Sequence, residues 1–71
     1  MSDISNVIEA IAYASANSSG KEHEFLKNMK NYLMTQDRYY EKKAKKLYKS
    51  LGYSSKARVD QFYNVLSNLY G

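Results

Sequence analysis

The chain has 71 residues without cysteine or proline, and its 11 basic residues outnumber its 7 acidic residues to give a net charge of +4. This length predicts a single domain over residues 1–71, which needs close helix packing or self-association because so small a core is marginally stable. The absence of cysteine excludes disulfides and thiolate metal sites, and the single histidine excludes a metal site built on several histidines.

The first expected element is a helix over residues 3–17. Its apolar side chains recur at helical spacing, at Ile4, Val7, Ile8 and Ile11. Ser2 is the expected N-cap, because its hydroxyl can accept from a free N–H of the first turn. Gly20 is the expected terminator, because glycine tolerates the left-handed backbone that ends many helices.

The second segment, residues 21–51, contains neither glycine nor proline and allows two interpretations. Leu26, Leu33, Tyr40 and Leu47 fall seven residues apart, which permits one long central helix. Alternatively, the chain breaks near residues 34–37, with Thr35 as the N-cap of a fresh helix and Asp37 in its first turn. The sequence leaves both alternatives open.

The third segment is a helix over residues 55–70, capped by Ser54 or Ser55. Its apolar stripe is the strongest in the chain and consists of Val59, Phe62, Tyr63, Leu66, Leu69 and Tyr70. No segment alternates apolar and polar residues as a strand would. The predicted fold class is therefore all-α, a compact bundle of three to four helices.

The basic charge is concentrated in residues 38–58, which hold eight Lys and Arg residues against Glu41 alone. At about 100° per residue, Arg38, Lys42, Lys45 and Lys49 fall within roughly 60° of arc. The apolar residues Tyr40, Ala44, Leu47 and Leu51 centre on the opposite side. We therefore expect one face for the core and one cationic stripe, and the shortage of acids favours a polyanionic partner.

Residues 47–59 follow the order of a helix-turn-helix: a helix, a turn at Gly52, a serine cap and a second helix. With Val59 and Tyr63 seven and eleven residues after the glycine, this segment resembles the second helix-turn-helix of AraC-type transcription regulators. The resemblance implies DNA binding, with Lys56, Ala57, Gln61 and Asn64 presented to base edges. Tyr48 departs from the pattern, because the family favours a small residue there to allow a close helix crossing.

The predicted function is nucleic-acid binding, to duplex DNA and in a regulatory role. The predicted nucleic-acid-binding residues are Arg38, Lys42, Lys45, Lys46, Lys49, Lys56, Arg58, Gln61 and Asn64. The cations would contact phosphates, and the amides of Gln61 and Asn64 can pair with adenine. Asp60 is predicted to lie on the same face and opposes this interpretation, because its carboxylate would repel phosphate.

The alternative is a small protein-binding inhibitor or adaptor, of a kind viruses encode, which docks on an acidic protein surface. Tyr13, Tyr39 and Tyr53 fall off the apolar stripes, and tyrosine is enriched at interface hot spots. Tyr32 shares an apolar stripe with Phe25, Met29 and Leu33 and is a further candidate. A homodimer is as compatible with the sequence as a monomer.

No catalytic residue, cofactor or metal site is predicted. His23 lies between two glutamates whose helical positions diverge, so we expect a solvated side chain, and we interpret Asp37 and Glu41 as ordinary surface charges. The acidic first residues and the absence of a long apolar run predict no membrane segment and a cytoplasmic, non-secreted protein.

Overall fold

The computed structural model describes the backbone of residues 3–70 and the side chains of residues 5–64. It contains four helices: α1 (Asp3–Ala16), α2 (Gly20–Thr35), α3 (Arg38–Ser50) and α4 (Tyr53–Tyr70). No strand occurs within residues 3–70, which confirms the all-α prediction. The expected cap Ser2 and the side chains of Leu66, Leu69 and Tyr70 lie outside the described residues.

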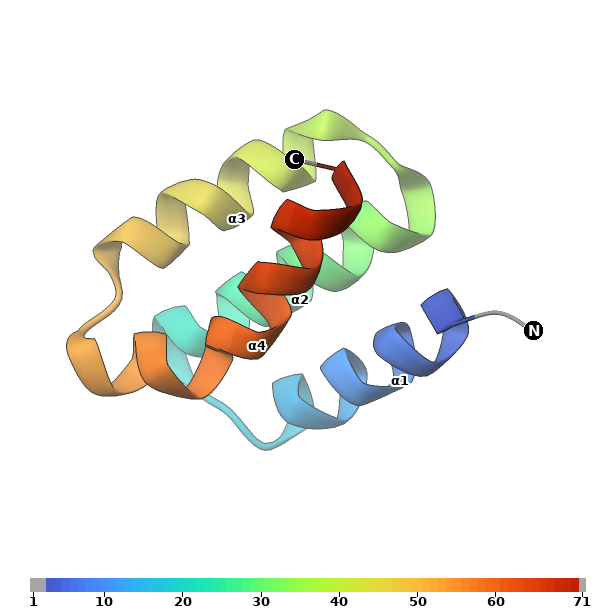
Figure 1. Cartoon of the computed structure of the whole chain (residues 1–71). Coiled ribbons are helices and arrows are strands. Elements are labelled where there is room, and N and C mark those ends of the chain that lie inside the picture. Colours follow the sequence, from blue (N-terminus) through green and yellow to red (C-terminus); the bar gives the residue numbers. More distant parts are fainter. Residues whose placement is uncertain (1–2, 71) are drawn as a thin grey trace.

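Helix α2 is the centre of the bundle. Figure 1 shows α1 and α3 on either side of α2, each running opposite to it, while α4 lies across α2 in the foreground. The core is formed where these helices meet and consists of Ile11, Phe25, Leu26, Met29, Tyr32, Leu33, Ala44, Leu51 and Val59. Since α2 supplies five of these nine residues, it positions the other three helices.

The chain breaks between α2 and α3, so the alternative of one long helix is wrong. Gln36 adopts a left-handed backbone (φ 59°) and donates its N–H to the carbonyl of Tyr32, which ends α2. Asp37 then caps α3, since its carboxylate accepts from the N–H of Tyr39 at 2.9 Å. Thr35 is the last residue of α2 rather than the expected N-cap, and its hydroxyl donates to the Asn31 carbonyl.

Two other predicted boundaries are also wrong. Gly20 does not terminate the first helix; α1 ends at Ala16, and Gly20 begins α2 with a φ of 63°. Helix α4 begins at Tyr53, where the N–H of Lys56 donates to the Gly52 carbonyl at 2.9 Å. Ser54 and Ser55 therefore lie inside the first turn of α4 instead of capping it.

No helix within the described residues is long and apolar enough to cross a membrane.

Candidate nucleic-acid interface

The inner face of α3 includes its only acidic residue. Glu41 is 3% exposed and shares this face with the buried Ala44 and Leu51 and the partly buried Tyr48, at spacings of three, four and three residues. The expectation that Glu41 is an ordinary surface charge is therefore wrong. Its helical position faces the core, and charge alone does not override that position when partners are within reach.

Two cations of the predicted stripe neutralise this buried carboxylate. The Arg38 Nε lies 3.2 Å from Glu41 Oε1, and the Lys45 Nζ lies 3.4 Å from Glu41 Oε2. Both cationic side chains keep much of their surface in water, 76% for Arg38 and 45% for Lys45. Arg38 and Lys45 cover the Glu41 carboxylate, and their ion pairs with it neutralise part of their positive charge.

The remaining lysines of α3 form its outer face. Lys42, Lys43, Lys46 and Lys49 are exposed, and none of them forms an ion pair with an acidic side chain among residues 5–64. Lys42, Lys46 and Lys49 follow one another at helical spacings of four and three residues, and Tyr39 precedes them by three. We call these four residues the outer row.

The edge of α3 that contacts α4 is aromatic. Tyr48 stacks on Tyr63 of α4 with ring centroids 3.9 Å apart and planes 5° from parallel, and its hydroxyl donates to the Asp60 carboxylate. This hydrogen bond raises the pKa of Tyr48 above its ordinary value, because the phenol donates to a carboxylate. The side chain that departs from the AraC-type pattern thus fills the contact between the two helices.

The position of Tyr48 places Lys56 beside the cationic stripe. The Lys56 ammonium lies 5.5 Å from the centre of the Tyr48 ring. Viewed along the α3 axis, Lys45 and Lys49 are rotated from Tyr48 by about 60° and 100°, both in the direction that leads away from the core. Lys56 therefore extends the α3 stripe onto the neighbouring edge of α4.

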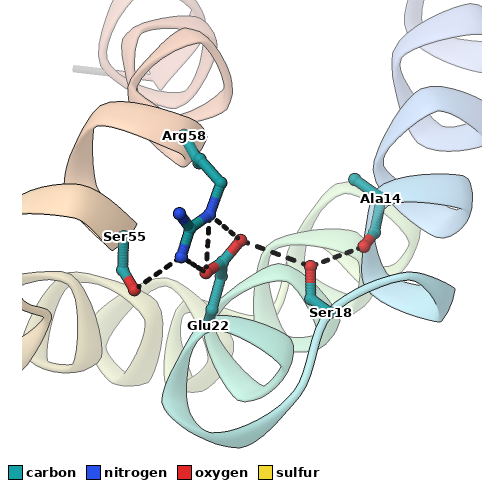
Figure 2. A network of polar contacts seen from close by, with 5 residues as sticks. All are labelled: Ala14, Ser18, Glu22, Ser55 and Arg58. Atoms are coloured by element: carbon teal, nitrogen blue, oxygen red, sulfur yellow. Dashed lines mark hydrogen bonds and ion pairs between the residues drawn. The ribbon is translucent and has the colours of Figure 1, made fainter.

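Arg58 lies elsewhere, because two residues of helix separate it from Lys56 by about 200°. Its guanidinium is bound to Glu22 of α2, with Nη2 2.8 Å from Oε1 and Nε 3.2 Å from both carboxylate oxygens. Figure 2 shows that Ser55 and Ser18 extend this network, and that Ser18 donates to the Ala14 carbonyl at the end of α1. Arg58 thus connects α4 to α2 and to the α1–α2 loop.

The Arg58 contact changes the titration of its partner. The guanidinium donates to the Glu22 carboxylate and holds its pKa below the ordinary value of 4.5. The same contact raises the pKa of Arg58. Because the Arg58 side chain is 60% exposed, water screens the ion pair with Glu22. We therefore interpret this pair as a contact that orients α4 relative to α2 and that adds little to the free energy of unfolding.

The two predicted base-reading amides are exposed on α4. Gln61 and Asn64 project from its outer side, together with Ala57. Gln61 also lines an open groove of about 700 Å³ between α4 and α1, along with Arg58 and Tyr13. The structure thus gathers Arg38, Lys42, Lys45, Lys46, Lys49 and Lys56 into one stripe, and it places Arg58 and Gln61 towards α1.

The exposure of the tyrosines largely follows the prediction. Tyr13, Tyr39 and Tyr53 are 76%, 59% and 89% exposed, as expected for residues off the apolar stripes. Tyr32 is only 5% exposed and belongs to the core, which confirms its place on the stripe with Phe25, Met29 and Leu33 and removes it from the interface candidates. It lies one turn from the buried Met29 and beside Leu33, which places it on the core side of α2.

His23 is not the solvated residue that the sequence predicts. It is half-buried, and its Nδ1 donates to the Ser15 carbonyl at 2.8 Å, which ties the first turn of α2 to the end of α1. Within the described part of the chain, no group of His, Asp and Glu residues is arranged to hold a metal ion. His23 therefore has a structural role in joining two helices.

Comparison of the chain with protein-family models, with curated proteins and with solved structures finds no match.

Proposed function

We propose that this protein binds nucleic acid, and that the outer face of α3 contacts the phosphate backbone. One observation carries the proposal: the only acidic residue of α3 is buried beneath Arg38 and Lys45. The solvent-facing side of this helix is consequently cationic along its whole length. A lysine-rich face that serves solubility alone normally mixes both signs of charge.

The arrangement has a cost that a polyanion would remove. Lys42–Lys46 and Lys45–Lys49 are like-charge pairs four residues apart, and each destabilises a helix by a few tenths of a kcal/mol, about 0.2–0.5. Phosphate groups that bind between these lysines turn repulsion into attraction and release condensed counterions. Lys42 and Lys49 are about 10 Å apart along the axis, at 1.5 Å per residue, which allows contact with several successive phosphates.

Sequence discrimination and a regulatory role remain predictions within this proposal. Gln61 and Asn64 have the exposure that base contacts need. Arg58 would first have to break its ion pair with Glu22 before it could bind a phosphate. The cytoplasmic location and the homodimer expected from the sequence also remain predictions.

A pair of charge-reversal variants tests the proposal. Lys42→Glu with Lys46→Glu alters the outer row, and Lys21→Glu with Lys27→Glu makes the same change of net charge at exposed lysines of α2. Titration of a labelled oligonucleotide followed by fluorescence anisotropy should show at least about tenfold weaker binding for the α3 pair and little change for the α2 pair. Equal losses in the two pairs would mean that net charge, and not this face, attracts nucleic acid.

The second candidate function is binding to a protein partner, and the exposure of Tyr13 favours it. This residue is 76% exposed on α1, a helix without a single cation, where a phosphate contact would not explain it. A pull-down that recovers one stoichiometric protein and is insensitive to nuclease would support this candidate over the first.

A further inference from the structure

The outer row of α3 begins with an exposed tyrosine, and a second exposed tyrosine follows its last lysine. Tyr39 opens the row and is 59% exposed, while Tyr53 follows Lys49 by four residues and is 89% exposed. Tyr39 and Lys49 are about 15 Å apart along the helix axis. Four residues of chain span at most about 14 Å, so the backbone of Tyr53 is within about 14 Å of Lys49, the last lysine of the row.

The two rings differ from the aromatic side chains that stabilise the fold. Tyr48 and Tyr63 stack on each other and contact Phe25, which is fully buried. Tyr39 and Tyr53 instead leave most of their surface in water. Tyrosine is amphipathic and is enriched at binding interfaces, so two exposed rings near a cationic row suit contact with a ligand.

The Tyr39 ring is held in place although it is exposed. It packs edge-to-face against Tyr40 with centroids 5.3 Å apart and planes at 73°. The Lys43 ammonium lies 5.6 Å from its centre. A ring that is already oriented loses little conformational entropy on binding, so it can act as a stacking platform.

The geometry points to single-stranded nucleic acid as the ligand of this face, and this inference rests on the proposed function. Phosphates of the strand lie along Lys42, Lys46 and Lys49, and unpaired bases stack on Tyr39 and Tyr53. Single-strand binders combine these same two elements, a cationic track and aromatic side chains. A duplex keeps its bases inside the helix, and the two rings would have no base face to contact.

Binding of a labelled single-stranded oligonucleotide of about 12 nucleotides, compared with the duplex of the same sequence, tests the inference. The wild-type protein should bind the single strand more tightly. Tyr39→Ala and Tyr53→Ala should each weaken single-strand binding by about 5- to 150-fold, the range measured when a stacking aromatic is removed. Neither substitution should change duplex binding.

Two controls separate stacking from other effects. Tyr13→Ala removes a tyrosine of α1 whose exposure, 76%, lies between those of Tyr39 and Tyr53, and it should leave binding unchanged. Tyr39→Phe keeps the ring and should bind the single strand as the wild type does. Circular dichroism of each variant should match the wild type, because Tyr39 and Tyr53 are outside the core.

The failures of the two proposals are distinguishable. If Tyr39→Ala and Tyr53→Ala lose no more affinity than Tyr13→Ala while binding still weakens with salt, the stacking inference is overturned and the phosphate interface stands. Tighter binding of the duplex than of the single strand would also overturn the stacking inference and leave the phosphate interface standing. If neither form of nucleic acid binds in a salt-dependent manner, both the inference and the proposed function are overturned.

Discussion

Replacing Glu41 with glutamine should destabilise the fold and strengthen nucleic-acid binding at the same time. The Glu41 side chain is 4% exposed, and its carboxylate pairs with Arg38 and Lys45. Glutamine has the same shape and can still accept one hydrogen bond, but it no longer holds two positive charges. The variant therefore lacks the two ion pairs that hold Arg38 and Lys45 against the helix, and its net charge rises by one unit from +4.

The expected loss of stability is modest. Hydrogen bonds to charged groups typically contribute about 1.5–3 kcal/mol. Arg38 and Lys45 are 76% and 45% exposed, so water screens the pairs, and we expect a loss of about 1 kcal/mol. For a domain of this size, that loss lowers the melting temperature by roughly 4–8 °C.

The expected gain in binding follows from counterion release. Each cation that engages a single strand adds about 0.7 to the magnitude of the slope of log K against log salt. Freeing Arg38 and Lys45 should therefore steepen the slope by up to about 1.4. Glu9→Gln is the matched control, since it makes the same charge change at an exposed residue of α1.

Thermal unfolding followed by circular dichroism and salt titrations followed by anisotropy measure both effects on the same samples. The reasoning is refuted if Glu41→Gln and Glu9→Gln give the same salt slope. It is also refuted if Glu41→Gln melts at the wild-type temperature, since the carboxylate would then not be paired as described.

Three further predictions concern the fold. The pKa of Glu22 is held below its ordinary value by Arg58, so the unfolded chain binds more protons at low pH than the folded protein does. The free energy of unfolding measured in urea should therefore fall as pH drops below about 5, and Glu22→Gln should flatten this pH dependence. An unchanged pH dependence in Glu22→Gln would contradict the role of Arg58. Gln36→Gly should raise the urea midpoint by an amount equivalent to about 1 kcal/mol at constant m, because glycine adopts the φ of 59° without strain; a lower midpoint would contradict the left-handed geometry. Phe25→Ala should cost about 3–5 kcal/mol, most of the stability of so small a domain, and a wild-type-like cooperative melt would contradict its central place in the core.

The helices could be predicted because their signals are local. The periodicity of apolar residues identifies α1 and α4 to within a few residues, and it identifies as helical the stretch that contains α2 and α3. The sequence alone does not decide whether α2 and α3 are separate helices. The left-handed residue at the break is Gln36, whereas glycine or asparagine usually occupies such a position. The sequence predicts Thr35 as the N-cap and Asp37 in the first turn, whereas Asp37 itself caps α3.

The site could be predicted only in part, because its details depend on contacts between distant residues. The cationic stripe follows from helical spacing within α3. The bond between Arg58 and Glu22 joins residues 36 positions apart, and no sequence pattern indicates it. Glu41 carried a usable signal, its spacing of three from Ala44 on the core face, but a charged residue is normally placed on the surface.

The salt dependence of binding to a single-stranded oligonucleotide tests the central claim most directly. The exposed lysines of α3 that form no ion pair are the three of the outer row, Lys42, Lys46 and Lys49, and Lys43 beside Tyr39. At about 0.7 per cation they predict a slope of log K against log salt near −3. A slope of about that size, reduced in the variant with Lys42→Glu and Lys46→Glu, is the result that the account predicts. A slope near zero, or no binding at about 50 mM salt, would contradict the account and leave the stripe as a solvated or protein-docking surface.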